Sequence, residues 1–343
     1  MKFSFKNDYS EGGHPQILES LLRNNLDQQA GYGDDKYSQK AKSLIKNKIE
    51  NPDSEIYFVS GGTQANLIVI SSILRPYQCV VSAATGHILN NETGAIEATG
   101  HKILSIEKED GKLNPSDIIP VLESHKNIPH QVMPKLVYIS NSTELGTIYT
   151  KKELENLSRF CKENNLYLFM DGARLGHALT SKISDLTLKD IAELTDVFYL
   201  GGTKNGALLG EAIVINNKDL QQDFAFNIKQ KGALLAKGRL LGIQFLELMQ
   251  NDLYFDLAKN ANQQAMKIKN ALSERGVQFL SDTYTNQIFP IFPNRMIEVL
   301  SEKFEFYVWK KVDENLSAIR LITSWNTQNK AVEEFIETFT SEL

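Results

Sequence analysis

Short apolar segments alternate with longer amphipathic segments between residues 55 and 215. Apolar runs of roughly four to eight residues bounded by turn signals are typical of buried strands, whereas apolar positions repeated every ~3.6 residues are typical of helices. The predicted strands are 56–59, 79–82, 102–106, 136–140, 166–170, 197–200 and 212–215, and the predicted helices between them are 63–74, 91–98, 115–123, 151–164 and 187–194. This alternation predicts an α/β fold in which helices cover both faces of a mainly parallel sheet.

The two ends of the chain follow different patterns. The first fifty residues are polar and rich in turn residues, with predicted helices at 16–25 and 38–50. A long helical stretch at 232–251 follows the alternating region, and beyond it the predicted helices are 255–274, 295–303 and 328–341, with predicted strands at 277–280, 287–292, 306–309 and 318–322. We therefore expect a large domain of residues 1–245, which includes an N-terminal arm, and a small C-terminal α+β domain of residues 246–343.

Composition and charge narrow the function classes. The 343 residues are 42% hydrophobic and 23% charged, with a net charge of −5 and no long run of Lys or Arg, so nucleic acid is not an expected partner. No apolar run approaches ~18 residues and the N-terminus lacks a signal-peptide core, so we expect a cytoplasmic enzyme that does not span a membrane. Cys79 and Cys161 lie in apolar stretches and are expected to be buried free thiols. The spacing of Cys and His predicts no metal site.

Three strand ends carry the residues with the clearest chemistry. Lys204 and Asp171 each follow a predicted strand, and Gly62 and Thr63 open the helix after another. Ligands of parallel sheets bind beyond the carboxyl ends of the strands, so we expect these groups to converge. Pyridoxal phosphate requires a Lys for a Schiff base, an acid for its pyridinium nitrogen and a cradle for its phosphate. The sequence therefore predicts a pyridoxal-phosphate site.

Each of these signals has a simpler structural interpretation when it is taken alone. The glycine-rich turn is also compatible with an ordinary helix cap, and Asp171 with the cap of the segment that follows it. The turn does not match the pattern G-x-G-x-x-G, which disfavours a dinucleotide cofactor. The combination, not any single residue, carries the prediction.

Three further residues are candidates for the same site. Arg174, three residues beyond Asp171, can bind a carboxylate through two parallel hydrogen bonds, and Arg320 places a charge inside an apolar strand, where it needs a partner. A structural salt bridge is the alternative for both. His87 follows a predicted strand and can stack on an aromatic cofactor or transfer protons, although it can also be a plain loop residue. The remaining histidines, which we expect to be surface or structural residues, are His14, His101, His125, His130 and His177.

Taken together, these residues resemble those of the fold type I pyridoxal-phosphate enzymes, and more narrowly those of the threonine aldolase / β-eliminating lyase family. The resemblance covers nearly the whole chain. The specific stretches are SGGTQAN (60–66), MDGAR (170–174), GGTKNG (201–206) and IRLITS (319–324). The stretches TELGTIYT (143–150) and GHILNN (86–91) look most like the phenylserine aldolase branch of the family.

The resemblance implies a role for each candidate residue. Lys204 would form the Schiff base, Asp171 would pair with the pyridine nitrogen and His87 would stack on the ring. The phosphate would be held by Gly62 and Thr63, with Thr203, and the substrate carboxylate by Arg174 and Arg320. Family members are homodimers or homotetramers with shared active sites, which implies that Tyr32, Lys229 and Lys237 are candidates to reach a neighbouring subunit's cofactor.

Two positions depart from the family pattern. Typical threonine aldolases carry Glu-Asn-Thr-His after the central strand, and here the stretch is Ser-Asn-Ser-Thr, so that Thr143 occupies the His position. The N-terminal Ser of the family, near the substrate carboxylate, is matched by Asn7. The group that removes the proton of the substrate's β-hydroxyl is therefore open, with His87 or a bound water as the candidates.

The resemblance implies retro-aldol cleavage of an L-β-hydroxy-α-amino acid, such as threonine, allo-threonine or phenylserine, to glycine and an aldehyde. The departure at Thr143 leaves another reaction of an amino acid on the same cofactor as the alternative, namely β-elimination, racemisation or transamination. A non-catalytic cofactor-binding protein is a third possibility, which an intact set of Lys204, Asp171 and Arg174 argues against.

Overall fold

A seven-stranded sheet forms the centre of the protein in the computed structural model, which describes residues 2–342. Its strands lie in the order β2-β8-β7-β6-β5-β3-β4. Their bounds are β2 (Glu55–Val59), β3 (Gln78–Ala83), β4 (Ile103–Ile106), β5 (Met133–Ser140), β6 (Tyr167–Asp171), β7 (Val197–Gly201) and β8 (Glu211–Ile215). Only β8 runs antiparallel to its neighbours in this sheet, so the predicted mainly parallel sheet is confirmed.

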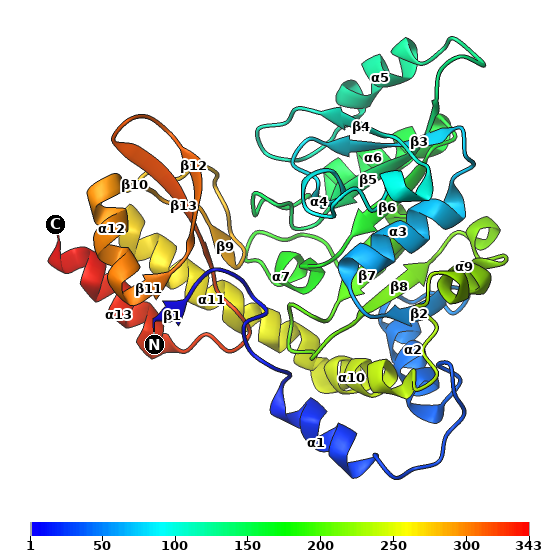
Figure 1. Ribbon diagram of the computed structural model, residues 1–343, viewed down its shortest axis with the longest axis horizontal. Coiled ribbons are helices and arrows are strands. Elements are labelled where there is room, and N and C mark those ends of the chain that lie inside the picture. Colours follow the sequence, from blue (N-terminus) through cyan, green and yellow to red (C-terminus); the bar gives the residue numbers. More distant parts are fainter. Residues whose placement is uncertain (1, 343) are drawn as a thin grey trace.

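Helices cover both faces of this sheet, as predicted (Figure 1). One face packs against α3 (Gly62–Ile73) and α9 (Phe224–Gln230), and the other against α2 (Lys36–Lys48), α6 (Lys151–Glu163), α8 (Leu188–Leu194) and α10 (Arg239–Met249). Side chains of β5 alternate between the two apolar clusters, because successive residues of a strand point to opposite faces. The remaining helices of this unit are α1 (Pro15–Arg23), α4 (His87–Asn90), α5 (Pro115–Ser124) and α7 (Leu175–Leu179).

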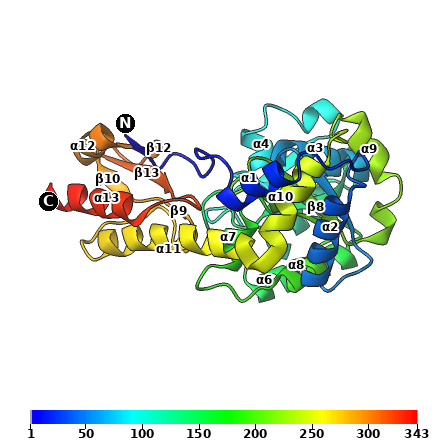
Figure 2. The same ribbon diagram turned by 90° about the horizontal axis from the view of Figure 1, so that it is seen from below.

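A second, smaller unit follows α10. Its antiparallel sheet has the order β10-β13-β12, with β9 also paired to β13, and a third apolar cluster lies between this sheet and its helices. The bounds are α11 (Leu253–Ser273), β9 (Gln287–Ile288), β10 (Ile291–Pro293), α12 (Asn294–Lys303), β11 (Phe304–Glu305), β12 (Tyr307–Lys311), β13 (Leu316–Ile322) and α13 (Asn329–Ser341). In Figure 2, α11 runs along the whole length of this unit.

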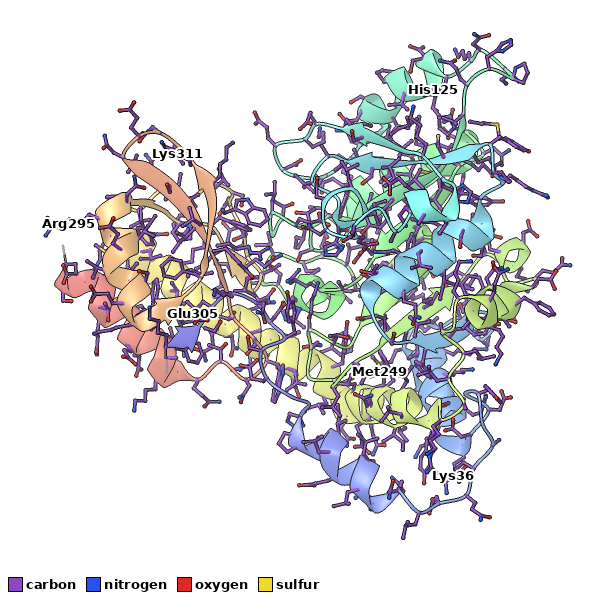
Figure 3. All side chains as sticks on the ribbon, viewed as in Figure 1. Lys36, His125, Met249, Arg295, Glu305 and Lys311 are labelled. Atoms are coloured by element: carbon purple, nitrogen blue, oxygen red, sulfur yellow. The ribbon has the colours of Figure 1, made fainter. Side chains whose placement is uncertain are left out.

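The N-terminal segment joins the small unit. Strand β1 (Phe3–Ser4) pairs in parallel with β11, so that Ser4 lies opposite Glu305, which is labelled in Figure 3. Phe5 is buried in the third apolar cluster. The predicted domain boundary near residue 245 falls inside α10 and stays a prediction.

Four secondary-structure predictions are wrong. The helix at 91–98 is reduced to a 3₁₀ turn at Glu97–Thr99, because Thr93 and Gly94 have positive φ. The long helix begins at residue 239 instead of 232. The predicted strand at 277–280 is a single bridge between Phe279 and Pro290. The predicted strand at 287–292 is divided at Pro290, because proline has no N–H to donate to a neighbouring strand. The sequence pattern also missed α7, because its five residues are too few to show a helical repeat.

Within residues 2–342, none of the helices combines the length and apolar character that crossing a membrane requires.

We expect the substitution Leu168→Ala, in the central strand β6, to lower the free energy of unfolding by about 3 kcal/mol, because it opens a cavity in a packed core. The Leu168 side chain is 1% exposed, whereas Leu22 on α1 is 80% exposed and provides the matched control. Leu22→Ala should change the unfolding free energy by less than about 0.5 kcal/mol. Urea denaturation measures both, and equal losses would contradict the assignment of the core.

Candidate active site

A cavity of about 690 Å³ lies at the carboxyl ends of the parallel strands. Its lining comes from the ends of β2, β5, β6 and β7 in the large unit, and from β12 and β13 in the small unit (Figure 1). The N-terminal segment also contributes, through Asn7 and Tyr9. The cavity is therefore built from segments that are far apart in the sequence, and only their folding brings them together.

Lys204 lines this cavity from the turn after β7. Two side-chain groups help to hold this turn: the backbone N–H of Gly202 donates to Glu211 Oε2 at 2.9 Å, and the backbone N–H of Gly210 donates to Thr203 Oγ1 at 2.9 Å. Burial, together with the nearby Arg174 guanidinium, lowers the pKa of the Lys204 amine. A lowered pKa increases the fraction of neutral amine, which is the form that attacks a carbonyl carbon.

Glu211, the first residue of β8, is a cavity residue that the sequence analysis missed. Burial raises the pKa of its carboxyl group to about 8. The available signal was a single acidic residue at the start of an otherwise apolar strand, where a charge is expensive unless it is compensated. It lies beside the Lys204 turn, where its Oε2 accepts the Gly202 N–H.

Asp171 is the last residue of β6 and is buried at the cavity wall. Its Oδ2 accepts hydrogen bonds from Tyr138 Oη at 2.6 Å and from Asn66 Nδ2 at 3.1 Å, while Oδ1 accepts from the backbone N–H of Ala173 at 3.0 Å. Burial by itself would raise the pKa of this carboxyl, but the hydrogen bonds from Tyr138 and Tyr199 outweigh it and keep the pKa below its ordinary value. The group is thus held as a carboxylate, the form that can pair with a protonated ring nitrogen.

A polar chain links Asp171 to His87 through two residues that the sequence analysis missed. Asn66 Nδ2, which donates to Asp171, also donates to Glu92 Oε1 at 2.7 Å. The same Glu92 oxygen lies 2.8 Å from Nδ1 of His87. Asn66 belongs to the stretch SGGTQAN, so its presence in a distinctive motif was the one available signal. This series of hydrogen bonds fixes the His87 ring at the edge of the cavity.

The start of α3 presents backbone N–H groups to the cavity at Gly62 and Thr63. The preceding Gly61 is extended and makes no side-chain capping bond, so the alternative of a conventional side-chain cap is not what the structure contains. The first intrahelical bond to Gly61 comes from the N–H of Ala65 at 3.0 Å. The earlier N–H groups of this twelve-residue helix have no intrahelical acceptor, and a helix N-terminus of this kind can hold a phosphate.

Arg174 forms a buried ion pair that the sequence did not reveal. Its Nε and Nη2 donate to Asp8 at 2.7 Å and 3.0 Å, and Asn286 Nδ2 donates to the same carboxylate at 2.9 Å. Burial opposes the charge of Asp8, but Arg174 and Lys204 outweigh this and hold the pKa of Asp8 far below its ordinary value of 3.8. Arg174 lines the cavity and also takes part in a structural salt bridge, the alternative that its sequence context left open.

Arg320, on β13, has no ion-pair partner among residues 2–342. Its guanidinium carbon lies 4.6 Å from the centre of the Trp309 ring and 5.4 Å from that of Tyr307, and its buried Nε has no hydrogen-bond partner in this part of the chain. Burial, reinforced by Arg174, lowers the pKa of Arg320. A partly buried guanidinium that has no acidic partner in the described residues and lies at a cavity wall is well suited to bind an anion.

Of the two positions that depart from the family pattern, Asn7 lies in the cavity lining and Thr143 lies outside it. Asn7 lines the cavity, and its Oδ1 accepts hydrogen bonds from the Tyr9 N–H and the Ser10 hydroxyl, each at 3.0 Å. Thr143 is fully buried, and its hydroxyl lies 2.7 Å from that of Thr147. The cavity lining includes the neighbouring Glu144 instead of Thr143.

The three residues considered for a neighbouring subunit lie away from the cavity lining. Tyr32 is exposed, and the Lys229 amine lies 4.7 Å from the centre of its ring. Lys237 is exposed nearby, in the segment that precedes α10. Their role stays a prediction.

The arrangement brings an amine of lowered pKa, a hydrogen-bonded carboxylate, an anion-binding helix start and an unpaired guanidinium around one cavity. A carbonyl compound with a phosphate and a basic ring nitrogen would find a partner for each of its functional groups. An amino acid attached to it would find a carboxylate partner in Arg320.

Comparisons with known proteins agree with this chemistry. Residues 6–293 match the family model described as beta-eliminating lyase. The chain is 32% identical over 337 residues to the low specificity L-threonine aldolase of Pseudomonas aeruginosa, covering 96% of this chain and 95% of that protein.

Solved structures give the same relationship. The fold superimposes on a structure of Leishmania major threonine aldolase with a TM-score of 0.98, at 48% identity and 99% coverage of both chains. An aspartate aminotransferase of Thermus thermophilus also has this fold, with a TM-score of 0.72 at 14% identity, covering 100% of this chain and 92% of that one.

We expect the substitution Asp8→Asn to lower the free energy of unfolding by roughly 3 to 5 kcal/mol near neutral pH, because it leaves the buried Arg174 charge without its partner. The pKa of Asp8 is lowered in the folded state, so its contribution is present above the ordinary pKa of 3.8 and is lost as the pH falls below that value. The difference between wild type and variant should therefore narrow in acid.

Chemical denaturation at a series of pH values measures this effect. Asp53→Asn is the matched control, because it breaks an ion pair with Lys218 in which both side chains are largely exposed. A loss for Asp8→Asn that is as small as that of the control, or that does not change with pH, would contradict the role assigned to the pair.

Proposed function

Because the chain belongs to the β-eliminating lyase family, we propose that it cleaves L-β-hydroxy-α-amino acids to glycine and an aldehyde. It is a pyridoxal-phosphate-dependent carbon–carbon lyase of fold type I. The observation that carries the proposal is the convergence of Lys204, Asp171 and the unpaired Arg320 on one cavity. The names of its relatives support threonine as one substrate.

The residues of the cavity fit the cofactor. Lys204 would hold it covalently, Asp171 would keep its ring nitrogen protonated, and the N–H groups at Gly62 and Thr63 would bind its phosphate, with Thr203 beside them. His87 would cover one face of the ring. When bound in this way, the cofactor accepts the electron pair of a bond broken at the Cα of the attached amino acid.

The choice of bond depends on orientation, which the chain's own residues provide. Arg320 would bind the substrate carboxylate, with Arg174 and Asn7 as neighbours, and would so fix the rotation about the bond between the amine and Cα. Held in this way, the substrate would present its Cα–Cβ bond as the one to be cleaved. The L configuration at Cα follows from the family resemblance.

The aromatic wall of the cavity bears on which substituent at the substrate's Cβ is accepted. Tyr307, Val308 and Trp309 line the cavity, and they supply apolar and aromatic surface that supports a bulky substrate such as phenylserine, besides threonine and allo-threonine. We further propose a cytoplasmic homodimer or homotetramer with shared active sites, in which Tyr32, Lys229 and Lys237 approach a neighbouring subunit's cofactor.

The decisive experiment is a comparison of products from L-phenylserine, L-threonine and L-allo-threonine with the cofactor-loaded protein. Equal amounts of glycine and aldehyde are expected, and the fastest substrate defines the specificity. Release of a keto acid and ammonia would instead identify elimination or transamination. A Schiff-base spectrum without any turnover would identify a non-catalytic cofactor-binding protein.

The substitution Lys204→Ala should abolish the absorbance of the lysine–cofactor Schiff base and lower aldehyde release by more than about 1000-fold, because no other group can take the place of the amine. Absorbance spectra of the loaded proteins measure the first effect. Lys189→Ala, which removes a surface amine paired with Glu50, is the control. A full Schiff-base spectrum in Lys204→Ala would overturn the cofactor assignment.

The substitution Arg320→Ala should raise KM for amino acids roughly 10- to 100-fold, because hydrogen bonds to the substrate carboxylate are lost. Arg320→Lys should recover only part of the affinity, since an ammonium cannot form two parallel hydrogen bonds. Steady-state kinetics measure both variants. Arg295→Ala is the matched control, because Arg295 lies on the exposed outer side of α12 (Figure 3). An unchanged KM in Arg320→Ala would indicate a purely structural residue.

A further inference from the structure

We infer that the carboxylate of Glu144 is the group that takes the proton from the substrate's β-hydroxyl. This is the role that is left open by Thr143, which stands where the family pattern has a histidine. This inference rests on the proposed function. It assigns a catalytic residue where the sequence pattern had left only His87 or a bound water as candidates.

The position of Glu144 supports this assignment. It lines the cavity on the side of His87, and its Oε1 accepts hydrogen bonds from the backbone N–H of His87 at 2.9 Å and from the Ser140 hydroxyl at 2.8 Å. These two bonds fix the orientation of the carboxyl group. Its second oxygen, Oε2, has no hydrogen-bond partner in residues 2–342 and is not enclosed by protein, so it is available to a ligand.

Other groups near the cavity are less suitable. The Thr143 hydroxyl lies against Thr147, outside the cavity lining. Asp171 uses both oxygens in hydrogen bonds and is reserved for the ring nitrogen. Glu211 lies beside the Lys204 turn, where its Oε2 accepts the Gly202 N–H.

His87 is the remaining alternative, and its geometry favours a different role. Its Nδ1 is engaged by Glu92 at 2.8 Å, which fixes the plane of the ring. A ring that lies flat on an aromatic cofactor directs its nitrogens away from the groups above that face. His87 therefore suits stacking, and its backbone N–H serves to position Glu144.

Burial, together with the charged and titratable groups that face Glu144, raises the pKa of its carboxyl group above the ordinary value. Burial raises the pKa of Glu144, and the Asp171 carboxylate raises it further, whereas the hydrogen bond from Ser140 and the charge of His87 oppose this. The groups that interact with its charge from the surrounding elements also include Arg174, Tyr138 and Tyr149. A carboxylate of raised pKa is a stronger base than an ordinary glutamate and still accepts a proton.

The proposed step balances in atoms and electrons. Oε2 of Glu144 takes the hydroxyl proton, the electron pair of the O–H bond becomes the second bond of the aldehyde C=O, and the Cα–Cβ bond breaks. Its electron pair stays on Cα, where the bound cofactor stabilises it. Cα then receives one proton from water to give glycine, and Glu144 releases its own proton to water, so the proton count of substrate and products is equal and Glu144 returns to its starting state.

The substitution Glu144→Gln separates catalysis from positioning. The amide oxygen of Gln can still accept the hydrogen bonds from His87 and Ser140, but the side chain cannot take a proton. We expect kcat for aldehyde release to fall at least about 100-fold with little change in KM, and Glu144→Asp to recover part of the rate. Glu109→Gln, which removes an exposed carboxylate outside this cavity, is the matched control and should behave as wild type.

The pH dependence supplies a second criterion. The base form of Glu144 is lost as the pH falls through its raised pKa, so the acid limb of kcat/KM in wild type should lie above the ordinary glutamate value of 4.5. The limb should move in Glu144→Asp and disappear in the residual activity of Glu144→Gln. A wild-type rate and an unchanged acid limb in Glu144→Gln would overturn the inference.

Two measurements do not depend on turnover. In the loaded protein labelled with carboxyl-¹³C glutamate, resonances of both Glu211 and Glu144 should titrate above 4.5 in wild type, and the one assigned to Glu144 should be missing in Glu144→Gln. Equilibrium binding of glycine, which has no hydroxyl, should be nearly equal in both proteins. The absence of such a resonance would contradict the inference.

The product assay distinguishes a failure of the proposed function from a failure of the Glu144 assignment. If wild type releases no aldehyde from any of the three substrates, the proposed function fails. If wild type releases aldehyde and Glu144→Gln does so equally well, the proposed function stands and the assignment of Glu144 is wrong.

Discussion

The compensation of buried charge at the carboxyl edge of the central sheet is the constraint on which the site depends. Asp171 remains ionised in the interior because Tyr138, Asn66 and the Ala173 N–H all donate to it. Arg174 is neutralised by Asp8 through two hydrogen bonds. Arg320 is the exception, since it is partly buried against two aromatic rings and has no acidic partner among residues 2–342. A carboxylate substrate would supply the missing charge, so the site is complete only when it is occupied.

The N-terminal segment connects the two units around this cavity. Strand β1 pairs with β11 of the small unit, and the N–H of Ile322 donates to the carbonyl of Phe5 at 2.9 Å. A few residues later, Asp8 reaches Arg174 of the large unit, and the N–H of His14 donates to the carbonyl of Gly206, at 2.7 Å, next to the Lys204 turn. One short segment thus ties both walls of the cavity, and the relative position of Arg320 and Lys204 depends on it.

The fold by itself leaves the reaction open. An aminotransferase with 14% identity has the same architecture, so the reaction must be argued from the site and not from the sheet. Here the informative features are local: Thr143 stands where the family pattern has a histidine, its hydroxyl lies against that of Thr147, and Glu144 lies in the cavity wall. The inferred role of Glu144 rests on these local features and not on the fold.

The linear sequence determined the main sheet, and it located Lys204, Asp171 and the glycine-rich turn at strand ends, because strand periodicity and turn residues are local properties. It failed where backbone conformation overrode the pattern, as at Thr93 and Pro290. Only the tertiary structure decided which charges are paired. Asp8 and Arg174 are 166 residues apart in the chain, and Asn66 and Asp171 are 105 residues apart, so no local pattern relates them. The strength of a charge interaction depends on distance and burial, and both exist only once the segments have packed together.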